Sequence, residues 1–298
     1  MFEDGQLYTP VLRTESGEVV VDLAADHPGS TDLEYRARRN QIAALAMDWS
    51  PGRPVPAAHY TEQEHAVWAV VSAELELKHE RLAAAAARRG RERLELPTDR
   101  IPQLTEVSEL LAPLTGFGYL PAAGLVPLRE FYGALADRNF WSTQYIRHHS
   151  VPLYTPEPDV IHEVIGHATT LADDEYAALY EAAGHAARRV ETDAALEFVS
   201  RVFWFSLEFG VVREDDSPKA YGAGLLSSYG EIEEMVDADL RPLDLGRMGV
   251  QTYDIGHYQP VLFAAESWSQ VQDVVGGFFT EVDDDLTERL GAAALAGR

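Results

Sequence analysis

The sequence predicts a mainly α-helical chain with a few short β-strands, folded as a single domain. Three observations lead to this prediction. Apolar residues recur at helical spacing through most of the long segments, strand-like runs are few and short, and no internal repeat or long Gly/Ser/Pro linker divides the chain. A chain of 298 residues is also long enough to bury a sizeable core. We therefore expect residues 1–298 to form one domain.

The first expected helix, Thr31–Trp49, has Thr31 as its N-cap, and the second, Thr61–Leu94, begins with a capping box formed by Thr61 and Glu64. Six more helices are expected, at Leu104–Leu114, Pro127–Asp137, Pro158–Leu171, Asp173–Arg189, Thr192–Gly210 and Gln259–Val275. The strand signals lie at Glu18–Leu23, Phe117–Tyr119, Val211–Arg213 and Lys219–Tyr221. We expect residues 1–30 to be an extended N-terminal segment and residues 281–298 to be a solvated terminal helix or a frayed end.

Composition excludes several kinds of site and partner. With 24 basic and 49 acidic residues, the net charge is −25, which argues against nucleic acid and anionic membranes as partners. The absence of cysteine excludes disulfides, thiolate metal sites and cysteine nucleophiles, so any metal must be held by His, carboxylate or carbonyl groups. No apolar run approaches the ~18 residues that would cross a bilayer, and the first residues lack a secretory pattern, so we expect a cytoplasmic protein.

The motif His162-Glu-Val-Ile-Gly-His167 places two imidazoles in one short segment, and Glu208 follows 41 residues after the second. Two neutral imidazoles and one carboxylate on one face of an octahedron form the facial triad of non-haem Fe(II) oxygenases. This pattern predicts a metal site bound by His162, His167 and Glu208, with iron and oxygen chemistry.

The spacing of the histidines excludes the His-Glu-x-x-His metallopeptidases, whose ligands lie four residues apart on one helix face. An ideal helix would place residues five apart roughly 140° from one another. Either His162 therefore lies on a loose opening turn or the helix contains a local bulge. Pro156 and Pro158 favour the opening turn, because proline suits a helix start.

The alternative interpretation is that the histidines are ordinary buried side chains with satisfied hydrogen bonds. Glu208 argues against it, since this carboxylate lies in the aromatic segment Phe203-Trp-Phe-Ser-Leu-Glu-Phe. Burying a carboxylate there is costly unless a cation or metal pairs with it. The metal interpretation is therefore favoured.

A set of motifs in order along most of the chain resembles the pterin-dependent aromatic amino acid hydroxylases, and most closely the short bacterial phenylalanine hydroxylases. The motifs are Asp26-His-Pro-Gly29, Tyr60-Thr-Glu-Gln-Glu-His-Ala66, Ile101-Pro-Gln-Leu104, Thr143-Gln-Tyr-Ile-Arg-His148, Tyr154-Thr-Pro-Glu-Pro-Asp159, His162 to His167, Trp204 to Gly210 and Lys219 to Ser228.

The resemblance implies a helical basket around a mononuclear iron site, with Fe(II), a tetrahydropterin (tetrahydrobiopterin or a bacterial equivalent) and O2 as cofactors. It also implies a monooxygenase that hydroxylates the ring of a free aromatic amino acid, most simply L-phenylalanine at the para position to give L-tyrosine. The alternatives are a phenylalanine 3-hydroxylase, a tyrosine or tryptophan hydroxylase, and a structural metal-binding protein without activity. We expect a monomer that lacks a regulatory domain and a tetramerisation helix.

Five residues are implied to bind the substrate. Arg147 offers a planar fork for its carboxylate, completed by Thr155 and Ser228, while Trp204 and Ile255 line the side-chain pocket.

The residues implied to bind the pterin are Gly124, Val126, Leu128, Phe131, Glu163 and Phe203. Phe131 would stack on the pterin ring, and the backbone of residues 124–128 would face the hydrogen-bonding edge of that ring. The Glu163 carboxylate would contact the pterin ring or the water bound to it. Ser227 resembles a group that orients a ligand imidazole. Trp141 and Phe203 stand where animal members carry histidine and often tyrosine, so they depart from the pattern near the pterin.

Overall fold

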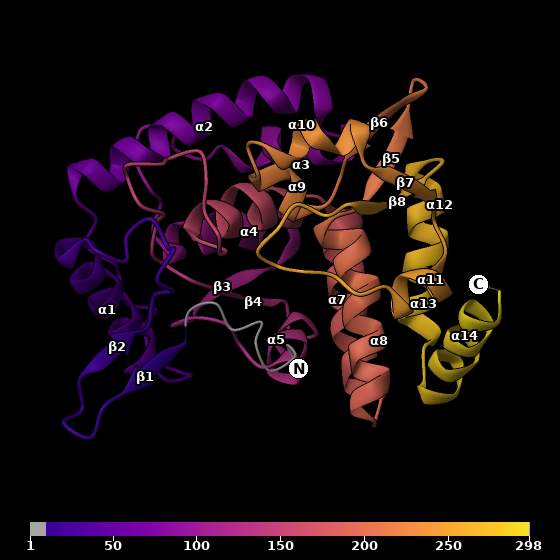
Figure 1. Cartoon of the computed structure of the whole chain (residues 1–298), viewed down its shortest axis with the longest axis horizontal. Coiled ribbons are helices and arrows are strands. Elements are labelled where there is room, and N and C mark those ends of the chain that lie inside the picture. Colours follow the sequence, from indigo (N-terminus) through magenta and orange to yellow (C-terminus); the bar gives the residue numbers. More distant parts are fainter. Residues whose placement is uncertain (1–9, 298) are drawn as a thin grey trace.

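The computed structural model describes residues 10–297 and confirms a mainly helical chain with short strands (Figure 1). The α-helices are α1 (Leu33–Met47), α2 (Glu62–Leu82), α3 (Ala85–Leu94), α4 (Leu104–Thr115), α5 (Leu128–Leu135), α6 (Thr169–Leu171), α7 (Asp174–Arg189), α8 (Asp193–Phe203), α9 (Ala223–Ser227), α10 (Glu231–Glu234), α11 (Leu245–Val250), α12 (Trp268–Gln270), α13 (Gly277–Glu281) and α14 (Asp284–Ala296). Three π-helical segments, η1 (His162–Ala168), η2 (Trp204–Glu208) and η4 (Val271–Gly276), and the 3-10 turn η3 (Met235–Asp237) adjoin them.

The strands form three small sheets. Strands β1 (Val11–Arg13) and β2 (Val19–Val21) pair antiparallel, and β3 (Gly118–Pro121) and β4 (Asn139–Ser142) pair parallel. The third sheet has the order β6-β5-β8-β7, from Ser217–Ala220, Val211–Glu214, Val261–Ala265 and Asp239–Pro242. All four strands expected from sequence are therefore present, although their ends differ by a few residues.

Two expected helices are wrong in part. The helix expected over Thr61–Leu94 is interrupted after Leu82, because Ala83 pairs with Ala220 of β6 and the Ala84 N–H donates to the Ala220 carbonyl at 2.8 Å. The first half of the helix expected over Gln259–Val275 is strand β8, which lies between β5 and β7. Its short apolar run is buried, and such a run is compatible with either a helix or a buried strand.

The start of α1 and the two terminal segments also differ from expectation. The N-cap of α1 is Asp32 rather than Thr31, since the Asp32 carboxylate accepts from the N–H groups of Glu34 and Tyr35. Of the expected extended segment 1–30, residues 10–30 contain the β1–β2 hairpin and the first nine lie outside the described residues. Residues 284–296 form α14, capped by Asp283 and packed along α11 and α8, so this segment is a helix and not a frayed end.

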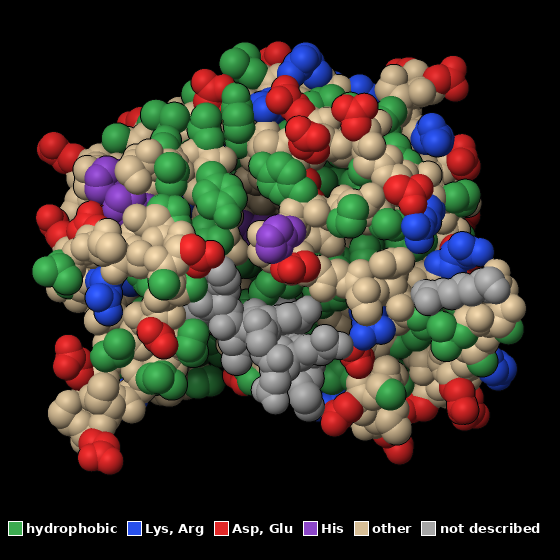
Figure 2. Space-filling view, in the orientation of Figure 1, with side chains coloured by type: hydrophobic (Ala, Val, Ile, Leu, Met, Phe, Trp, Pro, Cys, Tyr) green, Lys and Arg blue, Asp and Glu red, His purple; other side chains and the backbone are tan. Residues whose placement is uncertain are grey.

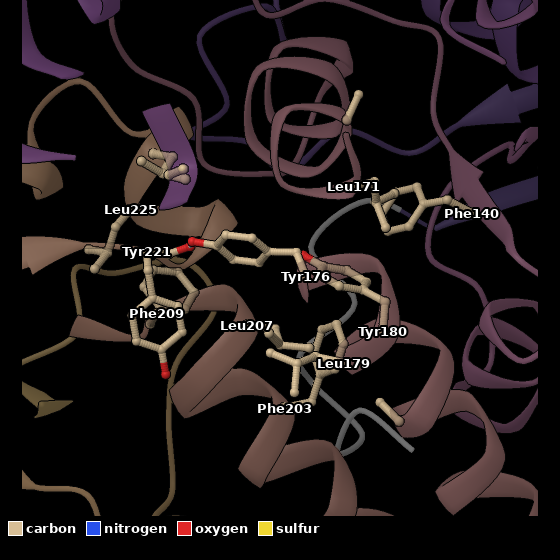
Figure 3. Packing of buried hydrophobic residues seen from close by; sticks show 14 of the residues in the cluster. Phe140, Leu171, Tyr176, Leu179, Tyr180, Phe203, Leu207, Phe209, Tyr221 and Leu225 are labelled. Atoms are coloured by element: carbon tan, nitrogen blue, oxygen red, sulfur yellow. The ribbon is translucent and has the colours of Figure 1, made fainter. Parts of the chain in front are cut away.

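One buried cluster forms the core, with members from Ala58 to Val282, and a smaller cluster lies under the β1–β2 hairpin. Figure 1 shows α7 and α8 side by side at the centre of the molecule, and the aromatic and leucine side chains of Figure 3 fill the space around them. Segment η1 packs against α9 so closely that a Cβ on Gly166 would lie 2.6 Å from the Ala223 carbonyl oxygen. Within residues 10–297, no helix combines the length and the apolar character needed to span a bilayer.

Candidate active site

The two histidines of the motif lie in the π-helical segment η1. In a π-helical turn the backbone hydrogen bond joins residues i and i+5, so residues five apart face the same direction. The rings of His162 and His167 accordingly meet edge to face with their centroids 4.6 Å apart, and their Nε2 atoms are separated by 3.0 Å. The local bulge is therefore the correct explanation of the spacing, and the loose opening turn that Pro156 and Pro158 favoured is wrong.

Glu208 ends the second π-helical segment, η2, and faces both imidazoles. Its Oε1 lies 3.0 Å from His167 Nε2, and its Oε2 lies 3.7 Å from His162 Nε2. Adjacent ligands of an octahedral metal, each bonded at about 2.1 Å, are roughly 3 Å apart. The two imidazole nitrogens and the Glu208 carboxylate thus lie close enough together to bind one metal ion.

Glu163 is the rival third ligand, because its carboxylate also lies within 4.8 Å of both imidazole donor atoms. However, its Oε1 accepts hydrogen bonds from the Thr143 N–H at 3.2 Å and the Thr143 hydroxyl at 3.0 Å. Burial raises the pKa of Glu163 to about 7 despite the opposing effect of His167. Glu208 is closer to the imidazoles and is therefore the better placed of the two carboxylates to be the third ligand.

Both imidazoles are held by hydroxyl groups on the side away from the metal position. His162 Nδ1 lies 2.8 Å from Ser227 Oγ, and His167 Nδ1 lies 2.9 Å from the hydroxyl of Tyr180. An Nδ1–H that donates to a hydroxyl leaves the Nε2 lone pair available for a metal. Burial, with a further contribution from His167, lowers the pKa of His162 to about 4, so this imidazole is neutral near pH 7.

Glu208 complements the neutral imidazoles with a negative charge. Burial alone would raise its pKa, but His167 and then His162 hold the pKa of this carboxyl below its usual value. Ser227 has the orienting position that the resemblance implied. Tyr180 was not found from the sequence, because it lies on α7 and only the packing of α7 against η1 brings its hydroxyl to His167.

We expect Tyr180→Phe to weaken metal binding by about 10- to 100-fold, because the Nδ1–H of His167 would lose its acceptor. The matched control is Tyr176→Phe, which removes a buried hydroxyl of the same helix that donates to the Tyr221 carbonyl. Metal titration followed by equilibrium dialysis measures both variants. Equal metal affinity in the two variants would contradict the role of Tyr180.

A pocket of about 250 Å³ includes the three residues of the triad in its wall. The sequence-predicted site residues all contribute to its wall: Gly124, Val126, Leu128, Phe131, Arg147, Thr155, His162, Glu163, His167, Phe203, Trp204, Glu208, Ser227, Ser228 and Ile255. These residues come from segments spread over more than a hundred positions, and the fold brings them to one cavity.

One edge of the Arg147 guanidinium group is already hydrogen-bonded. Its Nε and Nη2 each donate to the carboxylate of Asp159 at 2.9 Å, and both side chains are buried. The Nη1 group is on the other side of the guanidinium and remains suited to a second carboxylate. Thr155 Oγ1 donates to the Glu157 carbonyl, and Ser228 Oγ accepts weakly from the Glu231 N–H at 3.4 Å. Asp159, which fixes the orientation of the fork, was missed by sequence analysis.

Aromatic rings form another part of the wall. Phe131 lines the pocket and meets Phe140 and Phe203 edge to face, with ring centroids 5.6 and 6.4 Å apart. Trp204 stacks on Tyr253 at 4.1 Å, with an angle of 13° between the rings. Trp141 also lines the pocket, and its ring meets Trp49 edge to face at 6.0 Å. The cavity therefore combines flat apolar surfaces with a few charged and polar groups, which suits planar ligands.

Comparison with known proteins agrees with this geometry. Residues 13–292 match the family model described as biopterin-dependent aromatic amino acid hydroxylase. The chain belongs to this family. It is therefore an enzyme, a pterin-dependent monooxygenase that acts on an aromatic amino acid.

Two relatives show how far the similarity extends. A phenylalanine 3-hydroxylase of Streptomyces coeruleorubidus is 49% identical over 275 residues, which is 92% of this chain and 97% of that protein. The phenylalanine-4-hydroxylase of Bos taurus is 41% identical over 263 residues, which is 86% of this chain but only 58% of that protein.

Solved structures of bacterial phenylalanine hydroxylases share the fold. The apo enzyme of Colwellia psychrerythraea superposes with a TM-score of 0.73 at 29% identity, covering 83% of this chain and 94% of that one. The Chromobacterium violaceum enzyme with bound Fe(III) gives 0.72 at 30% identity, covering 79% and 85%. The same enzyme with iron(III) and 7,8-dihydrobiopterin gives 0.69 at 30% identity, covering 74% and 82%.

Proposed function

We propose that this chain hydroxylates the ring of free L-phenylalanine, using Fe(II), a tetrahydropterin and O2. The observation that carries the proposal is the convergence of His162, His167 and Glu208 in the wall of a pocket that Arg147 also lines. Iron and the reduced pterin supply the oxygen chemistry when bound. The protein holds the ligands, places the amino acid and excludes water from the pocket.

In this proposal the substrate carboxylate binds the free Nη1 edge of Arg147, with Ser228 and Thr155 beside it, and its ring lies against Trp204. The pterin stacks on Phe131 between the backbone of residues 124–128 and the Glu163 carboxyl. These roles are supported by the common pocket wall. Ile255 offers no hydrogen-bonding group, and a buried phenolic hydroxyl without a partner is costly, so tyrosine is the weaker substrate.

The ring position has two candidates. Para hydroxylation to L-tyrosine is the sequence prediction, and the 4-hydroxylase of Bos taurus supports it at 41% identity. Meta hydroxylation is the second candidate, because the 49% identical relative is a phenylalanine 3-hydroxylase. Product analysis by mass and retention time, with phenylalanine, tyrosine and tryptophan as substrates, tests both the substrate and the position. A clear preference for tyrosine or tryptophan would refute phenylalanine as substrate.

We expect oxidation to require a tetrahydropterin, and 2-oxoglutarate not to replace it. Enzymes that use 2-oxoglutarate need a cation for its distal carboxylate and usually have a strand-rich barrel, whereas this chain is mainly helical. Of the two arginines in the pocket wall, Arg39 is bound to Glu157, and the second edge of Arg147 is assigned to the carboxylate of the amino acid. Single-turnover assays with a tetrahydropterin or with 2-oxoglutarate measure how much hydroxylated product each co-substrate supports. Turnover with 2-oxoglutarate in the absence of pterin would contradict the proposal.

We propose in addition that the chain works as one catalytic domain and as a monomer in the cytoplasm. The single large core supports one folding unit, and the charge of −25 favours chains that repel one another. Figure 2 shows acidic side chains around much of the visible face, with fewer basic ones between them. Light scattering at low and high salt distinguishes a monomer from an assembly.

A further inference from the structure

Under the proposed function, on which this inference rests, the substrate is a zwitterion that carries an ammonium group about 3 Å from its carboxylate. Arg147 accounts for the carboxylate only. A buried ammonium group without an acceptor would cost binding energy. The pocket therefore needs an anionic or carbonyl acceptor close to the carboxylate anchor.

Four carboxylates line the pocket, and three of them already have other roles. Glu208 completes the triad, Glu163 is held by Thr143 beside the metal position, and Glu157 pairs with Arg39 at 2.6 Å. The fourth is Glu231, the first residue of α10. Among the described residues, no Arg, Lys or His side chain forms an ion pair with it.

The position of Glu231 fits the requirement. Its backbone N–H points to Ser228 Oγ at 3.4 Å, and Ser228 belongs to the proposed carboxylate anchor. Its Oε1 accepts one hydrogen bond, from the Gln259 N–H at 2.7 Å. The residue is 6% exposed, and burial raises its pKa to about 7, as expected for a carboxyl without a cationic partner.

We propose that the Glu231 carboxylate receives the α-ammonium group of the substrate and selects amino acids over aryl carboxylic acids that lack the amine. Oε1 keeps its bond to the Gln259 N–H while Oε2 accepts from the ammonium. Such a charge-assisted hydrogen bond adds affinity at the end of the molecule away from the reacting ring. Glu231 is thus a specificity-determining residue.

Glu231→Gln tests this role, because a glutamine Oε1 can still accept from the Gln259 N–H while the negative charge is lost. The experiment measures the binding of L-phenylalanine and of 3-phenylpropanoate to the iron-loaded enzyme by calorimetry. We expect L-phenylalanine to bind about 10- to 100-fold more weakly and 3-phenylpropanoate to bind as it does to the wild type. The KM for L-phenylalanine rises by a similar factor, and kcat changes less.

Glu234→Gln, an exposed glutamate of the same helix, is the matched control and leaves both affinities unchanged. Iron content and thermal unfolding verify that Glu231→Gln is folded. An equal loss of affinity for both ligands shows a merely structural role, and an unchanged affinity for L-phenylalanine shows no contact; either result overturns the inference.

If the wild type prefers another aromatic amino acid, the same comparison between that amino acid and its analogue without the amine tests Glu231, and only the proposed substrate fails. If the wild type binds no aromatic amino acid, both fail.

Discussion

Alanine at His162, His167 or Glu208 is expected to lower turnover by roughly 1000-fold or more and to remove the iron from a protein that otherwise holds one iron per chain. The reason is that the two imidazole Nε2 atoms and the Glu208 carboxylate oxygens lie 3.0 to 3.7 Å apart and act as one site. Loss of a ligand must weaken metal binding beyond the ~10- to 100-fold effect of an outer hydrogen-bonding partner. Metal analysis and steady-state assays measure both effects.

The helical circular dichroism signal of these variants should stay close to that of the wild type, because the helices are held by the large apolar core rather than by the metal. His185→Ala is the matched control, since His185 is exposed on α7. It should keep iron and activity. Full activity in any of the three ligand variants would refute the assignment of that ligand.

The second large effect is expected at Arg147. Arg147→Ala should raise the KM for phenylalanine by about 100-fold, because charge-assisted hydrogen bonds to the substrate carboxylate are lost. The iron should remain bound, since the triad does not include this residue. Saturation kinetics together with metal analysis separate the two properties, and an unchanged KM would contradict the substrate anchor.

A stability measurement must accompany this experiment. Removing the guanidinium leaves Asp159 buried without its partner, and breaking a buried ion pair costs about 3 to 5 kcal/mol. Arg147→Lys keeps a positive charge and is the informative companion, because it loses the fork geometry but not the charge. Arg100→Ala removes an exposed arginine paired with Glu106 and should change neither KM nor stability by much.

Much of the site was predictable because its chemistry is concentrated in short motifs. The pair His162 and His167 and the carboxylate of Glu208 are unusual side chains for an apolar neighbourhood, so the sequence alone indicates a metal. The supporting residues carry no such signal. Tyr180 and Asp159 are ordinary in sequence, and their roles arise only from tertiary contacts with His167 and Arg147.

The fold was predictable to a similar extent. Helical periodicity located α7 and α8, which each have a clear N-cap in Asp173 and Thr192. The strand β8 was mistaken for a helix because its five residues are apolar and lack alternation, as in a strand buried on both faces. The break between α2 and α3 could not be predicted either, because alanine favours a helix. Only the bridge between Ala83 and Ala220 of β6, which the fold brings together, interrupts the helix there.

The π-helical segment η1 makes the metal site depend on the number of residues in the backbone as well as on their identity. Deleting one residue between His162 and His167 would allow an ordinary α-helix, in which the two imidazoles could again share a face. If all the present residues closed into an ordinary α-helix instead, His167 would turn by about 100° away from its present direction. Glu208 and Tyr180 are fixed by other elements and could not follow that rotation. The five-residue spacing and the wide turn are therefore usable only together, so that a change in one requires a change in the other.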